Sequence, residues 1–343
     1  MDVAQYAIMF LASLLLPFVI VFTVMPSYIS LLKRKGRVVD DVHKQQATKV
    51  PSPAGPVLFL AFAIGEAVLY LATHSLVPVV LLSVGLITFL IGLVDDLFVL
   101  GGRTKPLLLM LGSLPIVVAG ILSTDVYTPR LFFPLFGSTG EHFTIYTLLI
   151  ILSIPVVANA FNMMDSFNGE ISSFTLITAV TLSVNVAIKA VFLAGYSLEH
   201  VAFSLPLVAI AASFYLFNKY PSKIFDGDSG SLLFGSVFAS LAVVEGVELS
   251  AVVSIIPAIL NSFYIISSLR GFVERRKVSY RPTHLGKDGL LYPSTEVKAP
   301  ITLVRMILLN SPMEEKEIVS YIVKLTIFSC GLSILTAILT WVF

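Results

Sequence analysis

Charged residues are scarce in this chain. Asp, Glu, Lys and Arg make up 13% of its 343 residues, against roughly 25% in soluble domains. So few charges cannot cover a water-facing surface of this size, and this excludes the soluble globular classes. Cysteine is nearly absent as well, because Cys330 stands alone and no disulfide can form within the chain. The net charge of +1 is uninformative as a total, and we expect no nucleic-acid partner.

Long apolar runs are what the chain does contain. Its mean hydropathy is +0.94, and runs of about twenty apolar residues, the length that crosses a bilayer as a helix, recur from end to end. The pattern predicts an all-α polytopic membrane protein, with residues 1–343 forming a single integral membrane domain. Ten membrane-spanning helices are expected, at about 4–32, 54–74, 77–94, 106–123, 143–161, 170–193, 201–217, 229–246, 249–272 and 318–342.

The distribution of basic residues predicts the orientation of these helices. Of the 22 Lys and Arg residues, all except Arg130 and Lys189 fall in one alternating set of loops and the adjoining helix ends. Positive residues mark the cytosolic side, so both termini are expected on the non-cytosolic side. The basic set of loops is 33–53, 95–105, 162–169, 218–228 and 273–317.

Two of the connecting segments are long. Residues 273–317 are expected to form a large cytosolic loop, and residues 124–142 an external irregular or hairpin segment. The membrane would be the plasma membrane in a prokaryote and the endoplasmic reticulum membrane in a eukaryote.

A pair of acidic residues ends the third apolar run. Asp95 and Asp96 follow LITFLIGLV directly, and Lys105 comes nine residues after the pair. Adjacent carboxylates at a membrane boundary are costly unless they bind a cation, take up a proton or reach water. The pair also fits a plain helix end in solvent, and the residues alone leave both interpretations open.

A ladder of amide and acidic side chains ends the fifth apolar run. Asn159, Asn162 and Asp165 are spaced i, i+3 and i+6, so a helix places them close to one face. Such a stripe suits a hard cation or a nucleobase, because carboxamides offer donors and acceptors. The alternative is hydrogen bonding between helices, with a C-terminal cap at Asn168 and Gly169.

A third motif precedes the eighth apolar run, where Asp226 and Asp228 flank a glycine. Oxygen ligands on a tight turn at a helix N-terminus suit Mg²⁺ together with phosphate. A simpler role as a helix N-cap is compatible with the same residues.

Basic and acidic residues also mark two of the predicted cytosolic loops. In the segment 273–317, Arg281 and other cations are suited to clamp a pyrophosphate or a sugar, although residues 275–277 fit ordinary cytosolic positive charge. His284 is weak evidence alone. The Asp40–Asp41 pair of the first loop is expected to be solvated. Together, the motifs on one side of the membrane describe an Mg²⁺-dependent phosphoryl-transfer site at the membrane surface.

The motifs resemble those of the polyprenyl-phosphate N-acetylhexosamine-1-phosphate transferase family. The matching segments are KVPSPAG at 49–55, DDLFVLGGRTK at 95–105, NAFNMMDSFNG at 159–169 and FNKYPSKIFDGD at 217–228, and their order covers about residues 33–290. The bacterial phospho-MurNAc-pentapeptide translocases carry a histidine-rich motif in the last large cytosolic loop. This chain has RPTH there, which resembles the archaeal and eukaryotic UDP-GlcNAc:dolichyl-phosphate GlcNAc-1-phosphotransferase branch.

The resemblance implies a role for each candidate residue. Asn162 and Asp228 are expected to bind the metal ion, which is Mg²⁺, or Mn²⁺ in its place. The catalytic residues are expected to be Asp95 and Asp96 beside the acceptor phosphate, and Lys105 as a neutralising cation. Substrate binding is expected from Phe225 stacking on uracil, Asn168 at the uracil edge, Arg281 and His284 at the pyrophosphate or sugar, and from Asp165 and Lys49.

The expected activity is transfer of GlcNAc-1-phosphate from UDP-GlcNAc to a polyprenyl, dolichyl-type phosphate. The products are UMP and polyprenyl-diphosphate-GlcNAc, the first membrane step of N-glycan assembly. One alternative is the same chemistry with another UDP-N-acetylhexosamine, for a cell-surface polymer. Another alternative is a transporter of nucleotide sugars or lipids. Such a protein would have polar residues near the middle of its spans, and Glu66 is an acidic residue inside a predicted span. A homodimer is compatible with the sequence.

Overall fold

The computed structural model describes residues 3–45, 48–123, 126–271, 273 and 278–342. Within these residues nine helices are long and apolar enough to cross a membrane, and a bent pair adds a tenth crossing if it is counted as one span. The chain is therefore an all-α polytopic membrane protein, as the sequence predicts. Its helices are α1 (Val3–Arg34), α2 (Gly55–Thr73), α3 (Leu76–Phe98), α4 (Thr104–Leu109), α5 (Leu114–Leu122), α6 (Phe143–Met164), α7 (Glu170–Phe192), α8 (Glu199–Ala202), α9 (Leu205–Asn218), α10 (Gly227–Val244), α11 (Glu248–Ser254), α12 (Ile256–Ser268), α13 (Leu303–Leu308) and α14 (Glu315–Trp341).

The ninth expected span is not one straight helix. The structure breaks the predicted run 249–272 into α11 and α12, whose axes differ by 68°. Pro257 lies in the first turn of α12, where its missing N–H would have no partner within the helix anyway. In the interior of one continuous helix the same proline would remove a hydrogen bond and clash with the preceding turn, so α11 does not run straight into α12. The apolar composition of this run indicated a span without indicating the bend.

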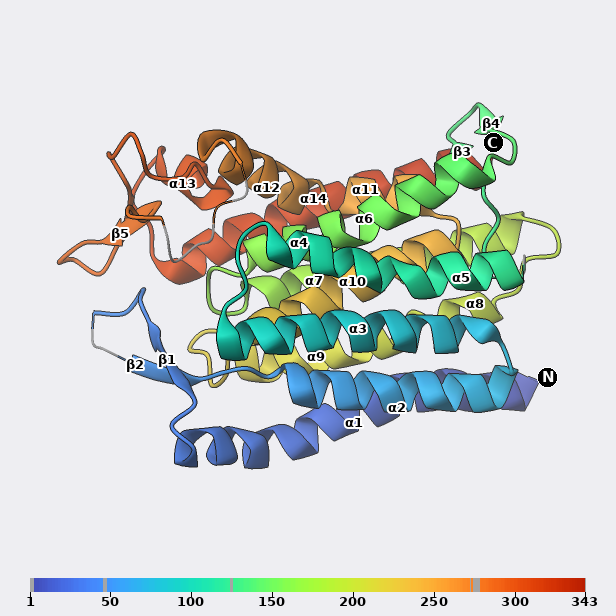
Figure 1. The fold of residues 1–343 in the computed structure, drawn as a ribbon, viewed down its shortest axis with the longest axis horizontal. Helices are drawn as coiled ribbons and strands as arrows, with labels where there is room; N and C mark the ends of the chain where they lie inside the picture. The colour runs from blue at the N-terminus through green and yellow to red at the C-terminus, as the bar shows by residue number, and fades with distance from the viewer. Residues whose placement is uncertain (1–2, 46–47, 124–125, 272, 274–277, 343) are drawn as a thin grey trace.

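Among the described residues, three two-stranded antiparallel hairpins connect the helices. They are β1 (Val38–Asp41) with β2 (Thr48–Pro51), β3 (Phe132–Phe133) with β4 (Gly137–Ser138), and β5 (Thr283–Leu285) with β6 (Leu291–Pro293). The first and third hairpins lie at one end of the bundle, whereas the second lies at the other end, where α1 begins and α14 ends (Figure 1). An even number of crossings brings both chain ends to one side.

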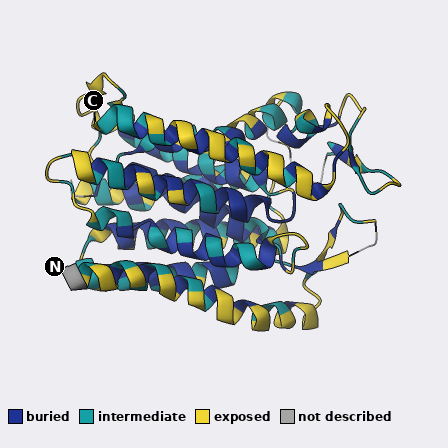
Figure 2. Ribbon diagram, turned by 180° about the vertical axis from the view of Figure 1, so that it is seen from behind, coloured by how far each residue is buried: buried dark blue, intermediate teal, exposed yellow. Residues whose placement is uncertain are grey.

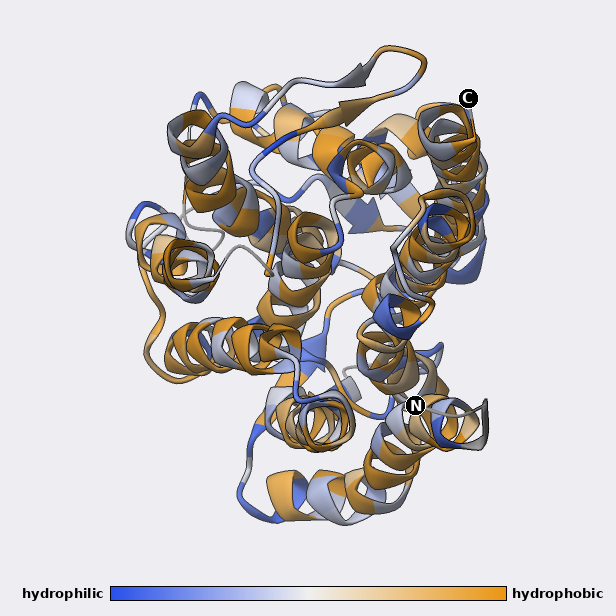
Figure 3. Ribbon diagram, turned by 90° about the vertical axis from the view of Figure 1, so that its right-hand side faces the viewer, coloured by the Kyte–Doolittle hydropathy of each residue, from blue (hydrophilic) through white to orange (hydrophobic). Residues whose placement is uncertain are grey.

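Helix α10 lies at the centre of the bundle. Every residue from Ser229 to Val244 is buried, and the helix packs on α3, α6 and α2. Its glycines, serines and alanines allow neighbouring backbones to approach closely, which is the usual way in which membrane helices associate. Buried residues line the inward faces of the bundle and exposed ones its outside (Figure 2), and hydrophobic residues predominate along the helices seen end-on (Figure 3).

The helices α3 and α10 approach each other closely at Gly92. A Cβ added there would stand 2.5 Å from the Cα of Ser229 and 2.6 Å from the backbone oxygen of Asp228. Because these are backbone atoms, they cannot turn aside. Gly92→Ala is therefore expected to lower the free energy of unfolding by about 1–3 kcal/mol, measured by denaturant unfolding in detergent.

The control for this prediction is Gly331→Ala in α14. A Cβ at Gly331 meets nothing within 4 Å, so that variant should be as stable as the parent or slightly more stable. Equal stability of the two variants would contradict the tight contact.

Candidate active site

Four helix ends bring their polar side chains together at the end of the bundle that carries β1 and β5. Lys105, at the start of α4, lies with its Nζ 2.7 Å from Oδ2 of Asp95 and 3.0 Å from Oδ2 of Asp228. The same ammonium is 3.3 Å from Oδ1 of Asn162, whose Nδ2 donates to Oδ1 of Asp228 at 2.5 Å. Residues from α3, α4, α6 and α10 thus form one cluster, as their motifs predicted.

Asp96 holds the N-terminus of α10 beside this cluster. Its carboxylate accepts from the backbone N–H of Asp228 at 2.8 Å and of Ser229 at 3.0 Å, and from Oγ of Ser229 at 2.6 Å. The first N–H groups of a helix lack hydrogen-bond partners within the helix and lie at the positive end of its dipole. A carboxylate there accepts the hydrogen bonds and offsets the positive charge. Asp96 therefore fixes the position of Asp228, and the adjacent Asp95 faces Lys105 instead.

The donor set of this cluster fits a hard divalent cation. Mg²⁺ is usually held by one or two carboxylates together with waters and substrate phosphates. Asp95, Asp228 and Asn162 direct three oxygens at one ammonium group, so a cationic centre already lies among them. No three His, Cys, Asp or Glu residues converge on a point in the described part of the chain, so a metal here would rely on Asn162 and on substrate oxygens.

A second pair of carboxylic acids lies behind the cluster. Asp226 is fully buried, and the pKa of its carboxyl group is raised well above the usual range by burial and by the neighbouring Asp165. Asp165 ends α6 and is only partly buried. The predicted contact of Asp165 with substrate stays a prediction.

Asn168 is buried at a junction of four segments. Its Nδ2 donates to Oδ2 of Asp41 at 3.1 Å and to Glu315, its backbone N–H donates to Glu315 at 2.9 Å, and its Oδ1 accepts from the N–H of Ser222 at 2.9 Å. Lys44 joins the junction by an ion pair with Glu315. Both N–H bonds of the side-chain amide are used within the protein, so the predicted uracil contact, which stays a prediction, would fall to Oδ1 or require one of these bonds to break.

The junction also corrects the interpretation of the first loop. Asp40 is exposed as expected, but Asp41 is buried, because it pairs with Asn168 and with Lys44. Alternation along the strand β1 turns the two neighbouring side chains to opposite faces.

Glu315 connects the start of α14 to the loop after α6 and to the first hairpin. Glu315→Ala would leave buried donors of Asn168 and the cation of Lys44 without their acceptor. We expect it to lower the free energy of unfolding by about 2 kcal/mol. Glu141→Ala, an exposed glutamate at the other end, is the control and should change it little. Equal losses in both variants would show that the junction contributes nothing.

The remaining substrate residues lie in the loops around the cluster. The backbone of Phe225 is clamped to the first hairpin, because its N–H donates to the oxygen of Pro51 and its oxygen accepts from the N–H of Ala54, both at 2.9 Å. Its ring is half-buried. Lys49 is exposed on β2, in register with Asp40, and the structure does not bring it into the cluster.

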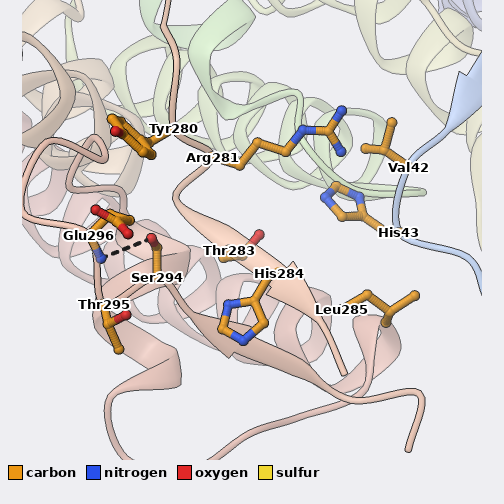
Figure 4. Close-up of a pocket in the computed structure, with 10 residues that line it drawn as sticks. All are labelled: Val42, His43, Tyr280, Arg281, Thr283, His284, Leu285, Ser294, Thr295 and Glu296. Carbon is orange, nitrogen blue, oxygen red and sulfur yellow. Dashed lines mark hydrogen bonds between the residues drawn. The ribbon is translucent and has the colours of Figure 1, made fainter. Parts of the chain in front are cut away.

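Arg281 and His284 line a cavity of about 420 Å³ between the first and third hairpins. The guanidinium of Arg281 points towards His43 of the first hairpin, whereas the imidazole of His284 points the other way (Figure 4) and stacks on Tyr292. Arg281 therefore faces the space that a substrate entering between the hairpins would occupy. His284 lines the same cavity from a different direction.

Three further residues that the sequence motifs did not predict shape the site, namely Glu315, Lys44 and Ser231. Ser231 accepts from Asn162 at 2.8 Å and so helps to orient it. Its position one turn into α10, in line with Asp228, was a usable signal. No comparable signal connects Glu315 to Asn168, since 147 residues separate them in the chain.

Comparison with known proteins extends the similarity over nearly the whole chain. Residues 78–246 match the model of glycosyl transferase family 4. A Sulfolobus acidocaldarius protein is 27% identical over 97% of this chain and 95% of its own. It is named, provisionally, as a UDP-N-acetylglucosamine–dolichyl-phosphate N-acetylglucosaminephosphotransferase. The enzyme of that name from Dictyostelium discoideum is 23% identical over 68% of this chain and 62% of its own.

Bacterial relatives are similar over the same region. A phospho-N-acetylmuramoyl-pentapeptide-transferase of Clostridium beijerinckii is 26% identical over 67% of this chain and 69% of its own. The family match covers α3 to α10, and so includes all four helix ends of the cluster. From α3 to α10 this integral membrane protein is similar to glycosyl transferase family 4.

Proposed function

We propose that the protein transfers GlcNAc-1-phosphate from UDP-GlcNAc to a polyprenyl phosphate of the dolichyl type, as the first step of N-glycan assembly. The observation that carries the proposal is the cluster of Asp95, Lys105, Asn162 and Asp228 at the ends of four membrane-spanning helices. Charged groups that can handle phosphate lie there at the edge of an apolar bundle. The names of the archaeal and eukaryotic relatives support the sugar and the lipid.

The reaction is a single in-line displacement. A phosphate oxygen of the acceptor lipid attacks the β-phosphorus of UDP-GlcNAc, and the bond between that phosphorus and the oxygen bridging to the α-phosphate breaks. UMP leaves with that oxygen and its electron pair. The lipid phosphate is already largely ionised near neutral pH, since the second pKa of phosphate esters is about 6. Asp95 is therefore needed to position Lys105 rather than to remove a proton.

The chain's own groups stabilise the charge that develops on the diphosphate. Lys105 supplies a cation held between Asp95 and Asp228, and Asp96 keeps the N-terminus of α10 in place. Preorganised groups of this kind lower the barrier because they do not reorient during the reaction. Mg²⁺, held by Asp228 and Asn162 with substrate oxygens, would supply further positive charge when bound.

The two substrates approach the cluster from different media. The polyprenyl tail of the acceptor remains among lipids along the helices, while its phosphate meets the cluster at their ends. The nucleotide sugar enters from water, between the first and third hairpins, where Arg281 faces the cavity. Positive charge around these loops supports placing this end of the bundle in the cytosol.

The test is UMP release by purified protein in detergent, given UDP-GlcNAc, Mg²⁺ and a polyprenyl phosphate. We expect UMP only when both the lipid and Mg²⁺ are present. A panel of UDP-N-acetylhexosamines should give the highest rate with UDP-GlcNAc. No UMP with any of these donors, together with uptake of a nucleotide sugar into vesicles that contain the protein, would favour transport and contradict the proposal.

A further inference from the structure

A second polar cavity lies at the opposite end of the bundle from the catalytic cluster. It has a volume of about 230 Å³ and lies between the segment around β3, the end of α7 and the turn after α10. Three basic side chains line it, Arg130, Lys189 and His200. Arg130 and Lys189 are the two cations that stand apart from all the others in the sequence, and the fold brings them to one place.

Neither of these two cations has a carboxylate partner in the described part of the chain. Lys189 is 6% exposed, and its Nζ donates to the backbone oxygen of Glu245 instead of to a carboxylate. Arg130 stands over the ring of Phe132, with its guanidinium carbon 4.9 Å from the centroid. Its Nε is buried and has no hydrogen-bond partner among the described residues. Placing two like charges together at a membrane boundary costs free energy unless an anion offsets them.

Glu245 and Glu248 lie near enough to act on the charge of Lys189, but neither forms an ion pair with it among the described residues. Glu245 accepts from the hydroxyl of Tyr196 and lies 3.0 Å from Nδ1 of His200. Glu248 accepts from the hydroxyl of Tyr146. Neither glutamate lines the cavity, so their carboxylates do not occupy the space in front of Arg130 and Lys189.

We propose that this cavity binds a phosphate group, presented by a lipid headgroup or as a free anion. Arg and Lys together are the usual donors to phosphate oxygens, Arg through its planar fork and Lys as a point charge. The cavity is smaller than the roughly 300–1,000 Å³ of sites for drug-sized ligands. A small anion or a headgroup therefore fits it better than a nucleotide sugar does, which separates this site from the catalytic one.

The single tryptophan of the chain lies beside two residues that line this cavity. The ring of Trp341 lies 4.9 Å from Nζ of Lys189 and packs on Phe132. Phosphate bound at the catalytic end would not reach it. The emission of Trp341 in the purified full-length protein can therefore be followed during titration with inorganic phosphate, at constant ionic strength. A second arm uses phosphatidic acid in mixed micelles, with diacylglycerol of the same chains as the lipid control.

We expect a saturable change of Trp341 emission in at least one arm. Arg130→Gln should raise the half-saturating concentration at least tenfold, because one charged donor is lost. Arg37→Gln removes the same charge from an exposed site at the other end and should leave the titration unchanged. Lys189→Gln is a second variant, used if Arg130→Gln changes the thermal unfolding midpoint.

The two arms distinguish the source of the phosphate. A response to phosphatidic acid at much lower concentration than to inorganic phosphate assigns the site to a lipid headgroup, and a response to inorganic phosphate alone assigns it to a soluble anion. No response in either arm, or an equal response in the parent and in the folded Arg130 and Lys189 variants, overturns the proposal.

Discussion

Replacing Asp228 with asparagine is expected to lower the rate of UMP release about a thousandfold while the protein stays folded. Asp228 is the member of the cluster that substrates can reach, because its side chain is 31% exposed whereas those of Asp95 and Lys105 are 6% and 12% exposed. Its carboxylate forms an ion pair with Lys105 and accepts a hydrogen bond from Asn162. Asparagine keeps the shape and the backbone bond to Asp96, but it loses the charge that balances Lys105 and that would hold a metal.

The matched control is Asp288→Asn, which makes the same chemical change in the turn between β5 and β6. Asp288 accepts from the hydroxyl of Tyr292 and the N–H of Leu290 in an exposed turn, so its loss should leave the rate close to that of the parent. A rate for Asp228→Asn within tenfold of the parent, at saturating Mg²⁺, would show that the carboxylate is not part of the transferring site.

The second large effect is expected for Lys105→Met, which removes the ammonium and keeps much of the side-chain volume. The rate should fall about a hundredfold, because the cation held between Asp95 and Asp228 no longer stabilises the charge that develops on the diphosphate. At the same time the Mg²⁺ concentration at half-maximal rate should fall about tenfold, because Lys105 and the metal compete for the same oxygens. A lower rate with tighter metal binding is a combination that simple unfolding does not produce.

The control for Lys105 is Lys35→Met, which removes an exposed ammonium just after α1. It should change neither the rate nor the Mg²⁺ dependence. If Lys105→Met instead weakened Mg²⁺ binding, the metal and the ammonium would not share their oxygen ligands, and the assignment of Asp228 and Asn162 to the metal would have to be given up.

Most of the architecture could be predicted from the sequence because a bilayer imposes a simple rule. Backbone N–H and C=O groups in the membrane must be hydrogen-bonded within helices, so hydropathy alone locates the membrane-spanning helices. The motifs predicted the cluster for a similar reason, because helix ends on the same side of the membrane lie close together in a bundle. The bend between α11 and α12 was missed because membrane helices also tolerate proline, as α6 does at Pro155.

The loops that complete the site were harder to predict. The contact of Asn168 with the uracil edge stays a prediction, and its bonds to Asp41, Ser222 and Glu315 were not foreseen. Asn168 and its three partners lie on four separate segments, and no local periodicity relates one loop to another. Lys49 and Arg281 are both exposed cations, and only the fold shows that Arg281 faces a cavity that Lys49 does not line.

The most direct test of the central claim is the identity of the lipid product and its ratio to UMP. Purified protein is incubated with UDP-GlcNAc, Mg²⁺ and a polyprenyl phosphate of known mass, and the lipid is then analysed by mass spectrometry. We expect a lipid heavier by one N-acetylhexosamine phosphate, with one UMP formed for each lipid molecule. A lipid heavier by the sugar alone, with UDP released in place of UMP, would contradict attack at the β-phosphorus and with it the role given to the cluster.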